Sequence, residues 1–497
     1  MPALYIGIDV GTTVLKAAAF DAGSGRVLAS ALRRLRVSAG ADGTREQSAE
    51  ALRGSLGAVI RELRSALKSC SKKVAGIGLA SQGGSTVICD RRTGAALTPL
   101  ILWNDVRHRP YMAQLLAARP KTYWRRLALR TTPGAGLARL LWFKDRAPGL
   151  IHHNNVYSGA GEFLFHALTG VWRQDAGNAV QTGCYDVPRE RLARSPLDII
   201  GVDASLIPPM REGHTTAPLS RDGGVLCGLP SGIPCAGPYM DHEAGYMSAA
   251  AVSRRPLQCS LGTAWVGNIV MPPEIKWRSP IQIVIPSPAG KGRLVVQPLL
   301  AGNAGWDWGL KELLPAGRGK AFEKCATVFD KAVLPHAGLV CMPWFTHGNH
   351  VSGGHGFGVF LGLNAHTPRE DMLRALACGM CFEFHRVFQH LFAGRIFDSV
   401  VLSGGLGKLS WFQKIFSALF HPVPVLITVD GDVSGARGAL YAFDRRIAST
   451  RTRGSPPPSE AAVTEICRRS QEYKAAFDLL LGAVETGAPI TLGRNAK

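Results

Sequence analysis

The start of the chain carries a strand–turn–strand pattern that few folds accommodate. Residues 4–10 alternate apolar residues with small or polar ones, which is the period of a β-strand. Gly11, Thr12 and Thr13 then predict a tight turn, and residues 14–20 run back as a second strand. A hairpin with this apex brings bare backbone and two hydroxyl groups to one edge of a sheet, which favours an alternating α/β fold.

The chemistry of this hairpin is suited to phosphate. Gly11 lets the backbone approach a phosphate group closely, and the Thr12 and Thr13 hydroxyls with the local amides donate to it. Lys16 adds a positive charge, and Asp9 is placed to hold Mg²⁺ directly or through water. The segment therefore predicts a phosphate-binding hairpin without a Walker sequence.

Two later strands deliver polar residues at their ends. Residues 74–79 predict a buried strand that leads to Gln82, whose amide both donates and accepts hydrogen bonds. A second apolar strand ends in Trp103, Asn104 and Asp105, and an aromatic face with fixed polar groups is typical of sugar sites. Trp103 taken alone would more often belong to the core.

Asp241 follows a predicted short strand over residues 232–238 and precedes an Ala-rich helix. One interpretation is that it removes a proton from a sugar hydroxyl. The other is that it is simply the N-cap of the helix, which is the commonest use of an aspartate there.

The second half repeats the outline of the first. Residues 257–261 and 264–270 predict strands joined by Gly262 and Thr263, which implies two related domains holding one polyphosphate, although such a turn also arises by chance. A glycine run at 404–408 follows the strand 399–402, where a nucleotide or a simple turn would fit.

Composition narrows the class of protein. The 497 residues, 46% of them hydrophobic and 19% charged, predict a globular chain of two or three domains. The sequence lacks a membrane-spanning apolar run and a signal-peptide pattern, so we expect a cytoplasmic protein with no membrane partner. The net charge of +21 could indicate nucleic acid, but the cations are dispersed and no such motif accompanies them, so none is expected.

Taken in order, these segments resemble the FGGY carbohydrate kinases, and the xylulokinase branch most closely. The most specific parts are residues 7–16, 100–107, 260–263 and 403–413, and the likeness runs from residue 4 to about 445. The resemblance implies two actin-like, RNase H-like ATPase domains with an interdomain cleft. It divides the chain into 1–250, which carries the sugar side, 251–447, which carries the nucleotide side, and 448–497, a linker around 451–459 with a final helix.

The resemblance also implies ATP and Mg²⁺ as cofactors, a sugar as substrate and a homodimer as a possible assembly. Asp241 would be the general base and Asp9 the metal ligand. The nucleotide and its phosphates would be held by Thr12, Thr13, Lys16, Gly262, Thr263, Gly302, Gly404 and Gly405. The substrate would be held by Gln82, Trp103, Asn104, Asp105 and His242.

Two departures from the family pattern leave the identity of the substrate open. Xylulokinases carry Met-His where this chain has Gly83 and Gly84, and many relatives have Asn or Gln at the position of His242. The substrate could therefore be xylulose, another ketose such as ribulose, a polyol such as erythritol, or a sugar acid such as gluconate. From another class, the chain could be an actin- or Hsp70-like nucleotide switch or a basic scaffold.

Overall fold

The computed structural model describes residues 3–67, 74–262, 265–272, 282–299, 302–314, 318–345, 358–394 and 396–486. The chain forms two compact units. The first comprises residues 1–254, 268–297 and 430–451, and the second comprises 255–267, 298–429 and 452–497. The domain boundaries expected from the sequence, at 250 and 447, remain predictions.

A six-stranded sheet organises the first unit. Its order is β12-β13-β6-β1-β2-β3, in which β1 pairs antiparallel with β2 and in parallel with β6, and β6 pairs in parallel with β13. The strands are β1 (Leu4–Val10), β2 (Val14–Asp21), β3 (Val27–Arg34), β6 (Val74–Ser81), β12 (Ala217–Pro218) and β13 (Pro234–Met240). The predicted hairpin at the start of the chain is thus confirmed.

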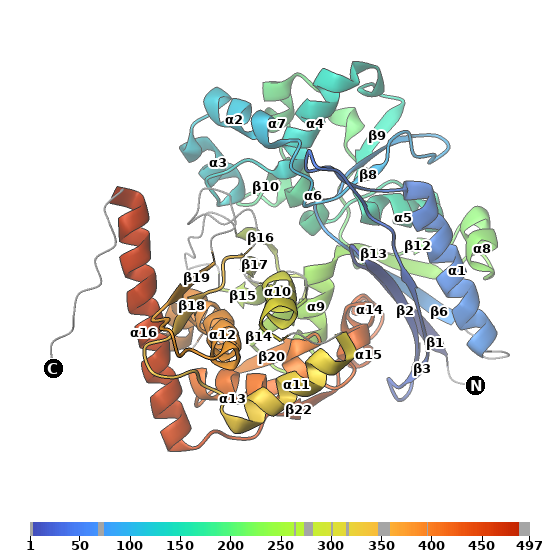
Figure 1. Cartoon of the computed structure of the whole chain (residues 1–497). Helices are drawn as coiled ribbons and strands as arrows, with labels where there is room; N and C mark the ends of the chain where they lie inside the picture. The colour runs from blue at the N-terminus through green and yellow to red at the C-terminus, as the bar shows by residue number, and fades with distance from the viewer. Residues whose placement is uncertain are drawn as a thin grey trace. The chain divides into compact units, whose positions relative to one another are not determined.

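Helices cover both faces of this sheet (Figure 1). On one face α1 (Ala49–Leu67) and α5 (Ala160–Thr169) pack on the strands, and the leucines of α1 are buried there. On the other face lie α9 (Asp241–Ala250) and α14 (Ser434–Gly438), packed through small residues.

Glycine makes this second face possible. A Cβ atom on Gly7 of β1 would lie 1.9 Å from the carbonyl oxygen of Ala436, and one on Gly78 of β6 would lie 2.2 Å from that of Ala439. The backbone after β21 therefore sits directly on the sheet, with no side chain between them.

A second apolar cluster of the first unit is built by helices and short strands between residues 88 and 207. It includes buried Trp124, Leu137 and Tyr157. The elements beyond the main sheet are α2 (Arg109–Ala118), α3 (Lys121–Ala128), α4 (Ala135–Arg146), α6 (Ala176–Thr182), α7 (Ser195–Ile200), α8 (Arg221–Cys227), α15 (Arg445–Ala448), β4 (Ser38–Ala39), β5 (Arg45–Gln47), β7 (Val87–Asp90), β8 (Leu100–Ile101), β9 (Asn155–Ser158), β10 (Tyr185–Asp186), β11 (Arg191–Leu192), β16 (Ile283–Pro286) and the 3-10 helices η2 (Pro148–Leu150), η3 (Ala204–Leu206) and η5 (Gly431–Val433).

The second unit is also α/β. Strand β14 pairs in parallel with β20, β20 in parallel with β21, and β21 antiparallel with β22. Its elements are β14 (Pro256–Leu261), β18 (Val340–Met342), β19 (Val359–Leu361), β20 (Ser399–Ser403), β21 (Val425–Thr428), β22 (Thr452–Gly454), α10 (Asn303–Leu313), α11 (Arg318–Lys331), α12 (Arg369–Ala393), η4 (Leu406–Lys408), α13 (Ser410–Leu419) and α16 (Glu460–Thr486). The chain passes between the units along β15 (Trp265–Met271) and β17 (Arg293–Leu299).

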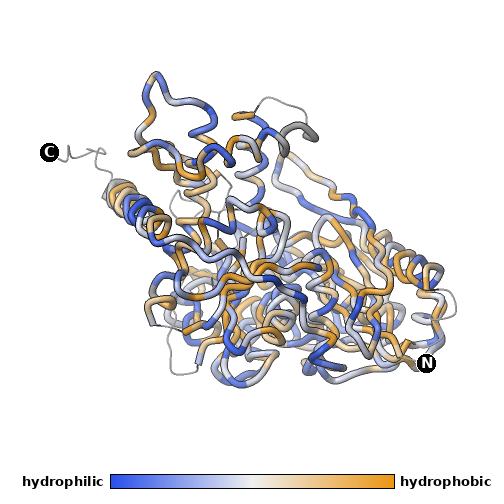
Figure 2. Tube along the Cα trace, turned by 90° about the horizontal axis from the view of Figure 1, so that it is seen from below, coloured by the Kyte–Doolittle hydropathy of each residue, from blue (hydrophilic) through white to orange (hydrophobic). Residues whose placement is uncertain are grey.

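Figure 2 shows apolar and polar residues alternating along α16, whose buried side includes Tyr473 and Phe477. Among the described residues, no helix has the length and apolar character needed to cross a bilayer.

Two short strands lie outside the main sheets' longer strands. In the stretch 451–459, where we expected a linker, Thr452–Gly454 form β22, which pairs with β21 at the edge of the sheet. Before α7 the chain forms β11, which pairs with β10 in a small hairpin.

Candidate active site

The phosphate hairpin places Asp9 and Lys16 together. The two residues are direct partners in the β1–β2 register, so their side chains emerge on one face. Burial and, after it, the charge of Asp241 raise the pKa of Asp9 to about 6, and Lys16 opposes the shift. A Cβ on Gly435 at the start of α14 would lie 2.3 Å from Asp9 Oδ2, so glycine is needed there for the helix to approach the carboxylate.

Asp241 is the first residue of α9, and it does not cap the helix. The N-cap position is Met240, and the backbone N–H of Met240 donates to Glu243 Oε2 at 2.9 Å. Among the described residues, the hydrogen bond recorded for the Asp241 carboxylate comes from the adjacent His242 N–H, at 2.9 Å. The N-cap interpretation of Asp241 is therefore wrong, and its partly exposed carboxylate is available for chemistry.

Glu243 belongs to a buried acid pair behind Asp241. Burial raises the pKa of Glu243 well above its ordinary value, and nearby Asp175 raises it further. The two carboxyl groups share a hydrogen bond, and the pKa of Asp175 is raised to about 6, chiefly by burial. Because two adjacent buried carboxylates repel each other, Glu243 is the member that retains a proton.

The sugar-side residues form one hydrogen-bond network with the hairpin. Trp103 Nε1 donates to Thr12 Oγ1 at 3.0 Å, and Thr12 Oγ1 donates to Gln82 Oε1 at 3.0 Å. Ser85 Oγ also donates to Gln82 Oε1, at 3.2 Å, and accepts a hydrogen bond from the backbone N–H of Trp103 at 3.1 Å. Trp103 remains 41% exposed, so its aromatic face is open to a ligand.

The amide nitrogen of Gln82 is the unused group in this network. Gln82 is 3% exposed, and its Nε2 has no hydrogen-bond partner among the described residues. A buried donor without a partner is costly, so a ligand oxygen at this place would be favoured.

Arg139 is a site residue that the sequence did not predict. This buried side chain of α4 donates to the carbonyl oxygens of Gly84 and, at 2.9 Å, of Trp103, and so ties the two sugar-side loops together. The available signal was an arginine inside the apolar helical stretch 137–144, where a buried charge needs fixed partners.

The remaining predicted substrate residues differ in exposure. Asn104 is exposed, and His242 Nε2 lies 3.9 Å from Asp241 Oδ1. Asp105 is 1% exposed and accepts from Arg107 and from the Arg45 N–H. Burial alone would raise the pKa of Asp105, but these hydrogen bonds outweigh it and lower the pKa, so we assign Asp105 to holding its loop.

The predicted glycines of the second unit converge at the ends of parallel strands β14 and β20. The Gly262 carbonyl accepts from the Asn303 N–H at 3.3 Å, next to Gly302 at the N-cap of α10. Gly404 has φ +103°, and a Cβ there would lie 2.6 Å from the Leu261 carbonyl oxygen. A Cβ on Gly405 would meet open space, while Thr263 lies outside the described residues.

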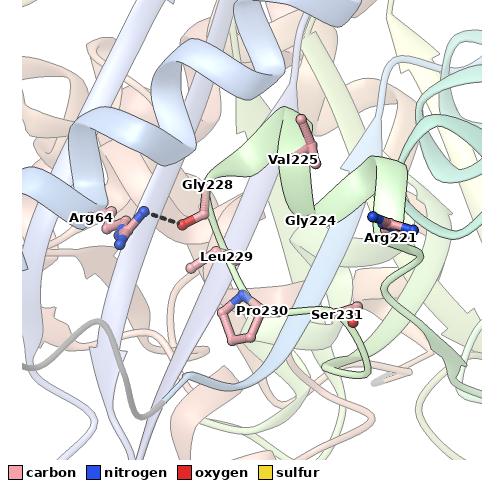
Figure 3. A pocket seen from close by; sticks show the side chains of 8 residues that line it. All are labelled: Arg64, Arg221, Gly224, Val225, Gly228, Leu229, Pro230 and Ser231. Atoms are coloured by element: carbon pink, nitrogen blue, oxygen red, sulfur yellow. Dashed lines mark hydrogen bonds between the residues drawn. The ribbon is translucent and has the colours of Figure 1, made fainter.

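A separate hollow of about 500 Å³ lies between α1 and α8 (Figure 3). It is lined by Arg64 and Arg221 with the backbone of Gly228, whose carbonyl oxygen accepts from Arg64 Nη1 at 2.6 Å. None of its lining residues carries a carboxylate or belongs to the network around Trp103.

The residues near Asp9 fit a hard divalent cation. Asp9 and Asp241 carry carboxylate oxygens, the ligands that Mg²⁺ prefers, and the charge of Asp241 raises the pKa of Asp9. A cation held at Asp9 would offset that repulsion.

These features define a class of protein. A glycine-threonine hairpin with a carboxylate and a lysine, a carboxylate at a helix start, and an open tryptophan beside a buried amide together define a carbohydrate kinase. Family comparison identifies it further. Residues 4–248 match the FGGY family of carbohydrate kinases, N-terminal domain, and residues 290–443 match the C-terminal domain of that family. The chain belongs to the FGGY family of carbohydrate kinases and is a sugar kinase, so membership gives no support to a switch or a scaffold.

The similarity extends over nearly the whole chain. The xylulose kinase of Bacillus subtilis (strain 168) is 25% identical over 484 residues, which cover 95% of each chain. Among solved structures, a xylulose kinase from Rhodospirillum rubrum has a TM-score of 0.83 at 22% identity, covering 97% of this chain and 100% of that one. A Plasmodium falciparum glycerol kinase with ADP has a TM-score of 0.79 at 16% identity, covering 96% and 98%. The predicted two-domain α/β fold is thus confirmed.

Proposed function

We propose that Asp241 is the general base in ATP-dependent phosphorylation of a small neutral sugar hydroxyl, with a ketose such as xylulose as the leading substrate. The observation that carries this proposal is that the two acids at the start of α9 have different roles. Glu243 accepts the hydrogen bond that caps the helix, so the Asp241 carboxylate, which is partly exposed and beside Asp9, has no capping role.

The chemical step follows from these positions. The substrate hydroxyl gives its proton to an Asp241 oxygen as its own oxygen bonds to the γ-phosphorus, and ADP departs with the electrons of the broken bond. The start of α9 carries a partial positive charge, which stabilises negative charge placed near it. Lys16 lies on the same face as Asp9 and is suited to neutralise phosphate charge.

Mg²⁺, when bound with ATP, supplies further charge neutralisation, and Asp9 is the residue that would hold it. We assign the nucleotide and its phosphates to the hairpin residues Thr13 and Lys16 and to the glycines at the ends of β14 and β20. The Thr12 hydroxyl serves the sugar side as well, because it joins Trp103 to Gln82.

The acceptor side favours a neutral compound. Trp103 offers an aromatic face for C–H groups, and Gln82 offers a free amide N–H for a hydroxyl or carbonyl oxygen. Two cations near this side, Arg107 and Arg139, are committed to Asp105 and to carbonyl oxygens. This arrangement speaks for xylulose, ribulose or a polyol such as erythritol over a sugar acid such as gluconate.

The test is ADP release from Mg·ATP across a panel of pentuloses, polyols and aldonates. We expect one neutral compound to drive turnover, and Asp241→Asn to lose it by orders of magnitude while ATP still binds. Turnover by Asp241→Asn within threefold of the wild-type rate would refute the base. An aldonate as the best acceptor would refute the neutral substrate class.

A further inference from the structure

In the loop after Gln82, two glycines leave a space that a side chain of α6 occupies. Gly83 and Gly84 lack side chains, and a Cβ on Gly83 would lie 2.8 Å from Met240 Sδ and 3.2 Å from Gln181 Nε2. A Cβ on Gly84, where φ is +78°, would lie 3.3 Å from Gln181 Oε1 and 3.4 Å from Trp103 Cβ. The carboxamide of Gln181 therefore occupies the space beside both glycines.

Gln181 is held firmly at its backbone and loosely at its amide. It lies on α6, and a Cβ on Gly136 of α4 would be 2.5 Å from the Gln181 carbonyl oxygen, so the two helices are in direct backbone contact. The side-chain Nε2 donates to Met240 Sδ at 3.6 Å, and a thioether is a weak acceptor. For its Oε1, no partner is recorded among the described residues.

The surroundings place this amide on the acceptor side of the site. Met240 directly precedes Asp241, and a Cβ atom on Gly84 would contact both Trp103 and Gln181. This amide is partly exposed and lies near the aromatic face and the base, and among the described residues its N–H group has only a weak acceptor as partner, so it has capacity for a hydroxyl group of a ligand.

We propose that Gln181 is a specificity-determining contact, which binds a hydroxyl of the acceptor that is not the one phosphorylated. This inference rests on the proposed function, since it deepens the account of the same site. With Gln82 it gives the acceptor two carboxamide contacts from two elements, the end of β6 and α6. The ligand class that fits is a neutral compound with at least two hydroxyl groups beyond the reacting one.

The experiment compares Gln181→Leu, which keeps much of the bulk and removes the polar atoms, with wild type on the best acceptor and its single-deoxy analogues. We expect KM for the acceptor to rise about 5- to 10-fold, with kcat within threefold and KM for ATP unchanged. With wild type, one deoxy analogue should have a KM raised by a similar factor over that of the full acceptor. With Gln181→Leu, the same analogue and the full acceptor should have similar KM values, because the substitution and the missing hydroxyl remove the same hydrogen bond. Gln114→Leu, the same substitution at an exposed position of α2, is the matched control.

Two results distinguish a failure of the Gln181 inference from a failure of the proposed function. If wild type phosphorylates an acceptor, but Gln181→Leu has the same KM and every deoxy penalty persists, the Gln181 inference is overturned while the kinase proposal stands. If no acceptor supports turnover by wild type, the proposed function itself fails. A Gln181→Asn variant that keeps the wild-type order of analogues would likewise count against a contact that depends on the length of the side chain.

Discussion

The carboxyl group of Glu243 accepts a 2.9 Å hydrogen bond from the backbone N–H of Met240, the residue immediately before Asp241. The start of α9 is thus stabilised from inside its first turn. A helix whose N-terminal N–H groups are satisfied in this way can carry a second carboxylate that has no capping role.

Replacing Asp241 should therefore separate activity from stability. We expect Asp241→Asn to lower kcat by about 10²- to 10⁴-fold, because proton removal from the acceptor is lost. The unfolding temperature should stay close to that of wild type, since Glu243 still caps the helix. Asp222→Asn, which changes an exposed acid in the first turn of α8, should leave kcat unaltered. A large drop in stability with Asp241→Asn would show that the carboxylate is structural.

Glu243 should show the opposite division. Glu243→Ala removes the hydrogen bond to Met240, and loss of a cap costs about 1 kcal/mol in the free energy of unfolding. Glu243→Gln retains an acceptor for Met240 and a donor for Asp175, so it should keep most of the stability and the activity. Urea unfolding and kcat of the two variants test this, and equal losses in both would contradict it.

Trp103 should govern the acceptor more than the nucleotide. Trp103→Ala removes the exposed aromatic face and the donor to Thr12, so we expect KM for the acceptor to rise about tenfold or more. Trp103→Phe keeps the face and loses the hydrogen bond, and should fall between this variant and wild type. Leu97→Ala, at another exposed apolar residue of the same unit, is the control. A rise confined to KM for ATP would contradict the assignment.

The contact between α9 and α14 should tolerate no side chain at Gly438. A Cβ there would lie 1.8 Å from the carbonyl oxygen of Ala244, so Gly438→Ala must separate two backbones and should cost about 1–3 kcal/mol. In Gly54→Ala, on an open face of α1, the new methyl meets nothing within 4 Å. That variant should be stabilised by about 0.5–1 kcal/mol. Thermal unfolding of the pair measures the contrast, and equal unfolding temperatures would refute it.

Stability should fall as pH rises, partly because of Glu162. Burial raises the pKa of this carboxyl group to about 8. The group also accepts a hydrogen bond from the backbone N–H of Gly159 at the start of α5. A group with a raised folded-state pKa contributes stability fully below its unfolded value, about 4.5, and loses that contribution as pH rises through about 8. Urea midpoints between pH 5 and 8.5 should therefore decline less steeply in Glu162→Gln than in wild type. Parallel slopes would show that Glu162 does not titrate in this way.

The sequence predicted what depends on short-range periodicity. The alternation in residues 4–10 and the Gly11 turn determine a register that sets Asp9 opposite Lys16, and the leucine spacing of α1 determines its buried face. Arg139 and Gln181 escaped prediction because their roles depend on which loops α4 and α6 meet. The capping role of Glu243 required helix geometry, since Asp241 and Glu243 are both acids at the same helix start.

The return of residues 430–451 to the first unit has a consequence for biosynthesis. Until α14 has been translated, the glycine-bearing face around Gly7 and Gly78 has no partner from that segment, although the strands themselves have long left the ribosome. In the nascent chain, the part of this face that α14 covers therefore stays without that cover until residues 434–438 have been made. The first unit can complete its packing only after nearly all of the second unit has been synthesised.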